Sequence, residues 1–348
     1  MLQIHYGHGA VLGRSSMGIR GTITGVFFLC LLAPATLRAQ ALTVYSALEE
    51  DEIAAYLEGA HKALPGLTIH VMRLSTGDLA ARLLAESAAP RNDVVWGQAV
   101  SSLLDPRLAG LLAPLSSPRI DAMPARYRDA TWYAPTGYVT AFCVNTEALA
   151  SRHLPMPRTW QDLAKPVYRG EVVMPDAASS GVGFMQVSAI TQVMGDRGWT
   201  LLGQIGRNVA QYTPSGSSPC KLARTGEYAI GVSLAFVALQ SIDAGYPVAM
   251  VVPSDIVGYE LEGSAIMKAS KNKAAATRFL DYLASPDAAR IYARFKTIVT
   301  VPGSKPDARQ VQMGLPADLD ARLAPVDFRI AARERSAIIA RFKALEDH

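Results

Sequence analysis

Residues 42–97 alternate between two kinds of apolar spacing, and this alternation limits the chain to few folds. LTVYS (42–46) and LTIHVMRL (67–74) have strand-like composition, and NDVVWG (92–97) contains a short apolar run. Between these segments, residues 48–64 and 78–88 carry apolar side chains at helical spacing. A strand–helix–strand–helix–strand order predicts an α/β fold, with a mostly parallel sheet and helices packed against its faces.

The same alternation continues after a surface stretch at 114–130 and predicts a second lobe. TGYVTAFCVN (136–145) is long enough to run as one strand between two lobes, and a second crossing is expected further along the chain. We therefore expect two α/β lobes joined by a two-strand hinge: 42–139 plus 256–348, and the insertion 140–255. Other strands are expected at 171–175, 209–213 and 228–233, helices at 181–195, 273–285 and 285–295, and an amphipathic helix from Asp327.

Residues 1–41 have the features of a secretory signal peptide. GVFFLCLLAPA (25–35) is an apolar run, with Arg14 and Arg20 before it and a small-x-small cleavage signal at Ala39 to Ala41 behind it. The run is too short to span a membrane. The sequence therefore predicts export with residues 1–41 removed, and a short buried helix is the alternative.

Removal of this leader changes the charge of the chain. The leader holds three arginines and no acidic residue, so the remaining chain has 31 basic against 30 acidic residues. A chain so close to neutrality gives no indication of a nucleic-acid partner.

Two cysteines, Cys143 and Cys220, remain in the mature chain. An oxidising compartment favours a disulfide between them, and two separate buried thiols are the alternative. Two cysteines with scattered histidines do not make a structural zinc site, so we expect neither a metal nor a cofactor.

Four Ser/Thr/Gly-rich turns lie where predicted strands end. They are Tyr45–Ser46, Ser75–Thr76–Gly77, Ser179–Ser180–Gly181 and the stretch 212–218. In open parallel sheets ligands bind beyond the carboxyl ends of the strands, where helix N-termini offer free N–H groups. Hydroxyl groups donate hydrogen bonds, and glycine lets the backbone approach a ligand closely. Such turns suit a small tetrahedral oxyanion, such as phosphate or phosphonate, held by hydrogen bonds rather than by lysine. The alternative is helix capping alone, because Ser46-x-x-Glu49 and Ser75-x-x-Asp78 both fit a capping box.

The sequence lacks the common hydrolase and nucleotide-binding motifs. It contains no GxSxG elbow, HExxH pair, CxxC pair or P-loop, and GVGFMQ (181–186) lacks the third glycine of a dinucleotide fingerprint. We therefore expect a binding protein rather than an enzyme. A secreted hydrolase of phosphorus esters is the alternative, because a catalytic triad can assemble from distant positions.

Several stretches resemble the solute-binding proteins of ABC importers. VYSALEEDEIAAY (44–56), RLSTGDLAARLLAE (73–86) and DVVWG (93–97) carry this resemblance, and residues 155–183 are typical of the group that includes ferric-ion-binding proteins. Residues 210–233, 264–295 and 327–339 are similar to the branch that binds 2-aminoethylphosphonate.

The resemblance implies a type II periplasmic binding protein, a monomer that closes on one solute and delivers it to an inner-membrane ABC permease. It also supports the Cys143–Cys220 bridge. The implied ligand is an organophosphonate, with 2-aminoethylphosphonate first. The expected ligand-binding residues are Tyr45, Ser46, Glu49, Ser75, Thr76, Gly77, Trp96, Ser179, Ser180, Gly181, Tyr212, Ser215, Tyr259 and Glu262.

Within this set, different residues serve the two ends of the ligand. Hydroxyls and amides would hold the phosphonate, while Glu49 and then Glu262 would bind the amine. Ala235 and Phe236 stand where relatives are expected to have an acid and a tyrosine. Phe236 cannot ligate iron, which argues against ferric ion. A ferric ion, a phosphate ester or a polyamine remain alternative solutes.

Overall fold

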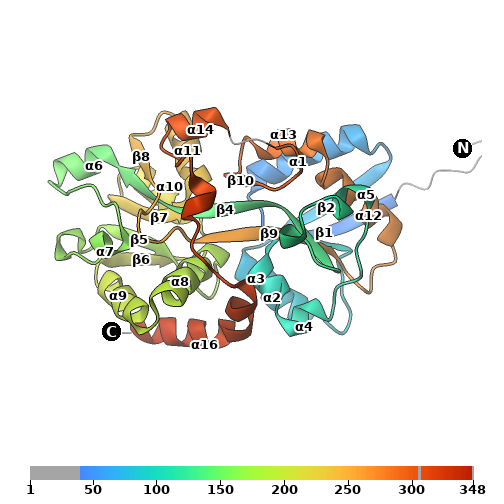
Figure 1. The fold of residues 1–348 in the computed structure, drawn as a ribbon, viewed down its shortest axis with the longest axis horizontal. Coiled ribbons are helices and arrows are strands. Elements are labelled where there is room, and N and C mark those ends of the chain that lie inside the picture. The colour runs from blue at the N-terminus through green and yellow to red at the C-terminus, as the bar shows by residue number, and fades with distance from the viewer. Residues whose placement is uncertain (1–39, 305–306, 347–348) are drawn as a thin grey trace, which may run out of the picture. The chain divides into compact units, whose positions relative to one another are not determined.

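The computed structural model describes residues 40–304 and 307–346, and its core is a mixed β-sheet with helices on both faces (Figure 1). Residues 1–39 of the predicted leader lie outside the described residues. The strand order is β2-β1-β3-β9-β4-β7-β5-β6, and β8 and β10 also pair with β4. The strands are β1 (Gln40–Ser46), β2 (Leu67–Arg73), β3 (Val94–Ala99), β4 (Trp132–Asn145), β5 (Val172–Pro175), β6 (Val209–Thr213), β7 (Ile230–Leu234), β8 (Val248–Val251), β9 (Tyr259–Ile266) and β10 (Ile298–Val299).

Most connections between the strands are helical. The helices are α1 (Glu50–Ala63), α2 (Thr76–Ala85), α3 (Val100–Leu103), α4 (Pro106–Ala109), α5 (Pro118–Asp121), α6 (Thr146–Ser151), α7 (Trp160–Leu163), α8 (Gly181–Met194), α9 (Asp196–Gly206), α10 (Ser218–Arg224), α11 (Ala235–Asp243), α12 (Lys273–Leu283), α13 (Pro286–Tyr292), α14 (Ala308–Gln312), α15 (Leu319–Arg322) and α16 (Phe328–Glu346). Two 3-10 turns lie at Ala125–Tyr127 and Pro166–Tyr168. The sequence did not predict α9 and α11 as separate helices.

The prediction of a mostly parallel sheet is correct only for part of the sheet. β1 pairs in parallel with β2 and β3, and β5 pairs in parallel with β6 and β7. β9 and β4 run antiparallel to their neighbours. These two strands return the chain through the middle of the sheet, so the sheet is mixed.

Strand β4 joins the two parts of the sheet. Its first half, from Trp132 to Val139, pairs with β9, and its second half, from Thr140 to Val144, pairs with β7. All fourteen residues of β4 are buried. The prediction of one long strand that passes from one part of the fold to the other is therefore confirmed, and the lobe boundaries remain a prediction.

Each part of the sheet has an aromatic core. In the first part Tyr56 packs against Trp96 and Tyr292, with ring centroids 5.9 and 4.8 Å apart. In the second part Phe142 packs edge-on against Trp160 at 5.3 Å. The strand-helix alternation thus buries an apolar layer on each side of β4.

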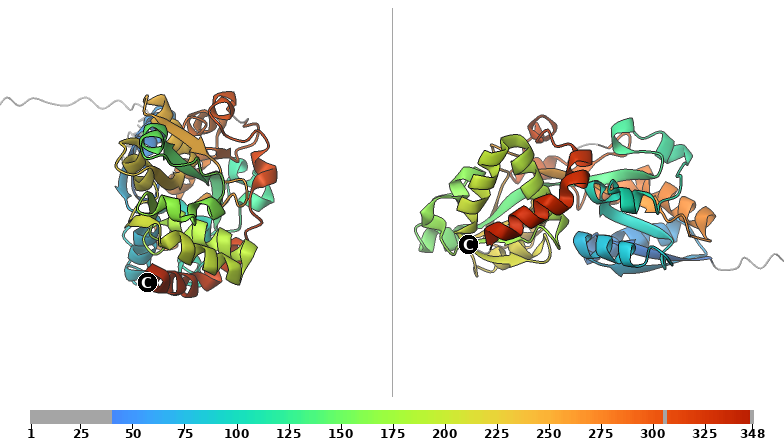
Figure 2. Two further views of the ribbon diagram at one scale, coloured as in Figure 1. Left: turned by 90° about the vertical axis from the view of Figure 1, so that its left-hand side faces the viewer. Right: turned by 90° about the horizontal axis from the view of Figure 1, so that it is seen from below.

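The C-terminal helix α16 follows Asp327, as the sequence predicts. Its Ile338 and Phe342 are buried in the core around Phe142 and Trp160. The helix contacts α3 as well as α8 and α9, and it lies along one side of the fold (Figure 2). The sequence assigned this helix to the first lobe, yet it contacts elements of both.

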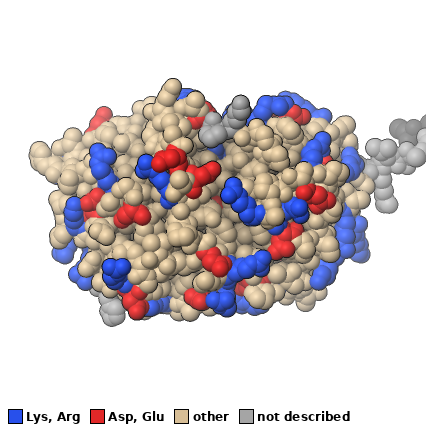
Figure 3. All heavy atoms as spheres, viewed as in Figure 1, with Lys and Arg blue, Asp and Glu red and all other residues tan. Residues whose placement is uncertain are grey.

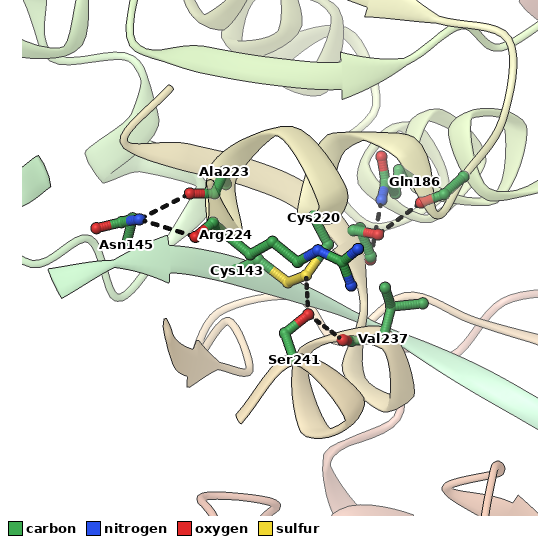
Figure 4. The surroundings of a disulfide bond; sticks show 10 residues. Cys143, Asn145, Gln186, Cys220, Ala223, Arg224, Val237 and Ser241 are labelled. Atoms are coloured by element: carbon green, nitrogen blue, oxygen red, sulfur yellow. Dashed lines mark hydrogen bonds between the residues drawn. A yellow bond between two sulfur atoms is a disulfide. The ribbon is translucent and has the colours of Figure 1, made fainter. Parts of the chain in front are cut away.

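A disulfide joins Cys143 of β4 to Cys220 of α10, with a Cα–Cα distance of 5.2 Å (Figure 4). This confirms the predicted bridge and excludes two separate thiols. Beside it, Asn145 Nδ2 donates to the backbone oxygen of Ala223 at 2.9 Å, and Ser241 Oγ lies 3.8 Å from the sulfur of Cys220. The disulfide and this hydrogen bond fix α10 against β4.

The face of the molecule in Figure 3 carries basic and acidic side chains side by side, without a broad patch of one sign. This distribution matches the near-neutral charge of residues 42–348. Among residues 40–304 and 307–346, no helix is long and apolar enough to cross a membrane.

Candidate functional site

A small pocket lies where four helices begin. It is lined by residues at the starts of α1, α2, α8 and α11, and by the turn before α10. Its volume is about 40 Å³, measured as the space open to the centres of water molecules. One water needs about 10–15 Å³ by this measure, so the pocket has room for a few atoms of a polar group.

The topology explains why these helix starts converge. Each helix follows a strand of a parallel pair: β1 leads to α1 and β2 to α2, while β5 leads to α8 and β7 to α11. The carboxyl ends of parallel strands meet at one edge of a sheet, so the helices that follow begin there. The first N–H groups of a helix lack partners within it and carry partial positive charge. The pocket is therefore suited to a negatively charged group.

Four of the predicted hydroxyls line this pocket: Ser75, Thr76, Ser180 and Ser215. Ser180 is the N-cap of α8, and its Oγ accepts a hydrogen bond from Gly183 N at 3.4 Å. These side chains and the adjacent Gly181 are brought together as the sequence predicts, from positions more than 100 residues apart.

Three further predicted residues lie beside the pocket but use their groups elsewhere. Ser46 is fully buried, and its Oγ accepts from Leu48 N at 3.2 Å. Ser179 Oγ donates to Asp176 at 2.8 Å. Gly77 N donates to the backbone oxygen of Ser179 at 3.0 Å. These residues shape the turns, and their polar groups are not directed at the pocket.

The predicted capping boxes do not form. Glu49, rather than Ser46, is the N-cap of α1. At α2 the Ser75 hydroxyl donates to the Asp78 carboxylate at 2.6 Å, and Ser75 makes no side-chain cap.

The four aromatic residues predicted to wall the site are absent from the pocket lining. Tyr45 is buried, and its hydroxyl donates to Glu86 at 3.0 Å. Trp96 belongs to the aromatic core of the first part. Tyr212 and Tyr259 pack on α16 through Phe342 and Phe328, with centroids 5.6 and 5.2 Å apart. The sequence did not reveal that α16 would cover these two rings.

The two carboxylates predicted to bind an amine do line the pocket, but each is paired with a cation of the chain. Glu49 lies 3.2 Å from Arg73 and 3.9 Å from Lys221. Glu262 accepts a hydrogen bond of 2.6 Å from Lys296. A ligand amine would therefore compete with side chains that already hold both carboxylates.

Lys296 is the main residue that the sequence analysis missed. Its side chain is 1% exposed, and its Nζ lies 2.6 Å from Glu262 and 2.8 Å from Glu52. It also lies 4.7 Å from the centre of the Phe236 ring, a cation–π contact. A lysine that the sequence did not predict thus lines the pocket, with its ammonium paired to two carboxylates, and the expectation that hydrogen bonds rather than a lysine hold the anion stays a prediction.

Burial sets the charges of this cluster. It raises the pKa of Glu52 from its usual 4.5 to about 8, although the Lys296 ammonium opposes the rise. Burial also acts to lower the pKa of Lys296, but the carboxylates of Glu262 and Glu52 outweigh it and leave that pKa above its usual value. Lys296 thus stays protonated, and Glu52 holds its proton to a higher pH than an exposed glutamate does.

Arg73, Tyr138 and Phe236 also line the pocket, although they were not predicted as ligand-binding. Arg73 lies near the end of a predicted strand, two positions before Ser75, so its position could have indicated the pocket. The segment around Lys296 has no motif, and only the fold brings it to Glu52 and Glu262. Within the described part of the chain, no group of His, Cys, Asp or Glu could hold a metal ion.

The family model for bacterial extracellular solute-binding proteins matches residues 106–330, more than half of the chain. An uncharacterized protein of Haemophilus influenzae is 31% identical over 224 residues, which cover 62% of this chain and 65% of that relative, just under two thirds of its length. A probable ABC transporter periplasmic-binding protein of Sinorhizobium fredii is 25% identical over 275 residues, 76% of this chain and 75% of that protein.

Two solved structures share the fold. The periplasmic binding protein AfuA from Actinobacillus pleuropneumoniae, with fructose-6-phosphate bound, has a TM-score of 0.80 at 25% identity, covering 88% of this chain and 99% of that one. A ferric binding protein from Campylobacter jejuni has a TM-score of 0.73 at 18% identity, covering 87% and 99%. The expected type II periplasmic-binding-protein fold is thus confirmed, and the chain belongs to the family of bacterial extracellular solute-binding proteins.

Proposed function

We propose that this protein is the periplasmic component of an ABC importer and captures a phosphorus oxyanion, an organophosphonate in the first place. The observation that carries the proposal is the convergence of four helix N-termini and four hydroxyls on one small pocket. Charge-assisted hydrogen bonds are worth about 1.5–3 kcal/mol each, so a few of them supply micromolar affinity after the cost of association. The captured solute would then pass to an inner-membrane permease.

Within this class, 2-aminoethylphosphonate is the first candidate, on the resemblance of residues 210–233 and 264–295. Its phosphonate would bind Thr76, Ser180 and Ser215 and the helix N-termini around them. Its ammonium would have to compete with Arg73 for Glu49 or with Lys296 for Glu262.

A phosphate monoester without an amine is the second candidate. It is favoured because Glu49 and Glu262 are already paired with Arg73 and Lys296, so neither carboxylate needs a ligand amine. AfuA, whose structure holds fructose-6-phosphate, supports this candidate by analogy. A polyamine is disfavoured because both pocket carboxylates already face cations. Ferric ion is disfavoured because Phe236 cannot donate an oxygen to it.

A calorimetric panel on the purified protein tests the proposal. It contains 2-aminoethylphosphonate, ethylphosphonate, fructose 6-phosphate, inorganic phosphate, putrescine and ferric citrate. Tighter binding of 2-aminoethylphosphonate than of ethylphosphonate supports the first candidate, and binding of fructose 6-phosphate alone supports the second. Binding of putrescine or iron only would overturn the proposal. In a separate activity assay, turnover of an aryl phosphate would show a hydrolase instead.

A further inference from the structure

The buried cluster of Lys296, Glu52 and Glu262 lies at the edge of the pocket and is not explained by the folding of the core. Lys296 and Glu262 both line the pocket, and Glu52 lies behind them on α1. The side chains of all three are at most 6% exposed. A buried ion cluster is costly to desolvate and adds little net stability. Because the cluster lies beside an anion pocket, we expect it to act in ligand binding.

The two carboxylates of this cluster are held differently. Glu262 accepts two hydrogen bonds of 2.6 Å, from Lys296 Nζ and from Thr136 Oγ1. Glu52 has a single partner, since its Oε2 lies 2.8 Å from Lys296 Nζ, while among the described residues its Oε1 has no hydrogen-bond partner. Burial without a second hydrogen-bond partner disfavours the ionised form of a carboxyl group, so Glu52 is the member of the cluster that takes up a proton.

The charge of the cluster therefore depends on Glu52. With both carboxylates ionised and Lys296 protonated, the cluster carries one net negative charge, which repels an anion. With Glu52 protonated the cluster is neutral. Repulsion between an incoming anion and this buried charge is scarcely screened by solvent, so the anion favours the protonated form.

Other groups around Glu52 act in the same direction. The titratable groups that act on Glu52 or Glu262 are Lys296, Glu49 at the N-cap of α1, Tyr56 of α1, Tyr292 of α13 and Tyr138 of β4. Apart from Lys296 these groups are acids or tyrosines, and the other cation of the pocket lining, Arg73, is paired with Glu49. Lys296 is thus the cation that balances the cluster.

We propose that Lys296 determines the charge specificity of the pocket, and that Glu52 takes up a proton when an anion binds, so that capture is coupled to proton uptake. The proton comes from solvent and forms an O–H bond on the Glu52 carboxylate, with no other bond made or broken. The ligand leaves together with this proton. The inference rests on the proposed function, because it requires that the pocket accepts an anion.

Calorimetry in two buffers of different ionisation enthalpy tests the inference. At pH 8, the parent should take up more protons than Glu52→Gln when each binds the tightest phosphorus oxyanion of the panel. The difference should approach half a proton. Glu52→Gln should bind this anion at least as tightly as the parent. Above pH 8 the affinity of the parent should fall by up to about tenfold per pH unit relative to that of Glu52→Gln. The difference between the parent and Glu52→Gln excludes the protons that the ligand itself takes up or releases, because these are the same for both proteins.

Two other variants complete the experiment. Glu58→Gln makes the same change on the exposed side of α1 and should match the parent. Lys296→Gln in the Glu52→Gln background leaves Glu262 as an unbalanced charge and should weaken anion binding at least tenfold; circular dichroism shows whether this variant folds, and the single Glu52→Gln variant decides the question if it does not.

The outcomes separate the two proposals. Binding by the parent with equal proton uptake in Glu52→Gln overturns the inference and leaves the proposed function standing. Absence of binding by every phosphorus oxyanion in the panel overturns both.

Discussion

Ser75 Oγ, at the start of α2, lies 2.9 Å from the backbone oxygen of Ser179, 104 residues later and just before α8, and shares its one proton between this oxygen and the Asp78 carboxylate. Gly77 N donates to the same oxygen at 3.0 Å. These bonds join the turns on two sides of the pocket, so the structure shows the pocket closed on this side. A ligand that bridges the two turns would stabilise the same arrangement.

The close approach of these turns predicts that Gly181→Ala weakens ligand binding. A Cβ on Gly181 would lie 2.7 Å from Thr76 Oγ1 and 2.8 Å from Thr76 Cβ. The new methyl group would push the start of α8 away from α2 and disfavour the closed arrangement. We expect at least a tenfold loss of affinity, measured by calorimetry, with little change in the melting temperature of the free protein.

Gly203→Ala is the matched control, because it is also a helical glycine. Its added Cβ would meet only Leu345 at 3.6 Å, an ordinary contact. This variant should bind like the parent. If Gly181→Ala also binds like the parent, the two turns do not need to approach each other in the bound state.

Thr76→Ala and Ser180→Ala should each weaken binding of a phosphorus oxyanion. Both hydroxyls line the pocket, and loss of a hydrogen bond to a charged ligand costs about 1–3 kcal/mol, or roughly a 5- to 150-fold rise in Kd. Thr225→Ala is the control, since Thr225 is exposed at the end of α10. Unchanged affinity in both pocket variants would place the anion elsewhere.

The disulfide should contribute to stability rather than to binding chemistry. Cys143→Ala/Cys220→Ala removes a link between positions 77 residues apart, and loss of such a link costs about 2–5 kcal/mol. Chemical denaturation of the oxidised parent, the reduced parent and the double variant measures this loss. Equal stability of all three would show that the packing of α10 on β4 suffices without the bridge.

Local patterns predicted the part of the site that depends on single turns. Ser75, Thr76, Ser180 and Ser215 each follow a strand that periodicity reveals, and parallel strands bring their carboxyl ends to one edge. The long strand β4 was predictable for the same reason. The antiparallel direction of β9 was not predictable, because the composition of a strand does not indicate its direction in the sheet.

Long-range partners could not be predicted from the sequence. Tyr212 and Tyr259 have the composition of cleft residues, yet α16 covers both. Lys296 lies in a segment without a motif, and it meets Glu52 from 244 positions away only through the fold. The charge balance of the pocket therefore depends on contacts that spacing along the chain does not encode.

We predict that the free protein loses stability as the pH rises, because two of its carboxyl groups are buried. Burial raises the pKa of Glu52 to about 8 and that of Glu260 to about 7, whereas both titrate near 4.5 in the unfolded chain. Between pH 4.5 and the raised values, the folded state holds more protons than the unfolded state. Stability therefore falls with rising pH in this window and levels off above pH 8.

Glu52→Gln should remove the Glu52 part of this dependence. Its amide cannot ionise, so between pH 7 and 8 its free energy of unfolding should fall less steeply than that of the parent, by up to about 1.4 kcal/mol per pH unit. Urea denaturation at pH 6, 7, 8 and 9 measures both curves, and Glu58→Gln should follow the parent because Glu58 is exposed. Parallel curves for Glu52→Gln and the parent would mean that burial does not raise the pKa of Glu52 in the folded protein, and this prediction would be wrong.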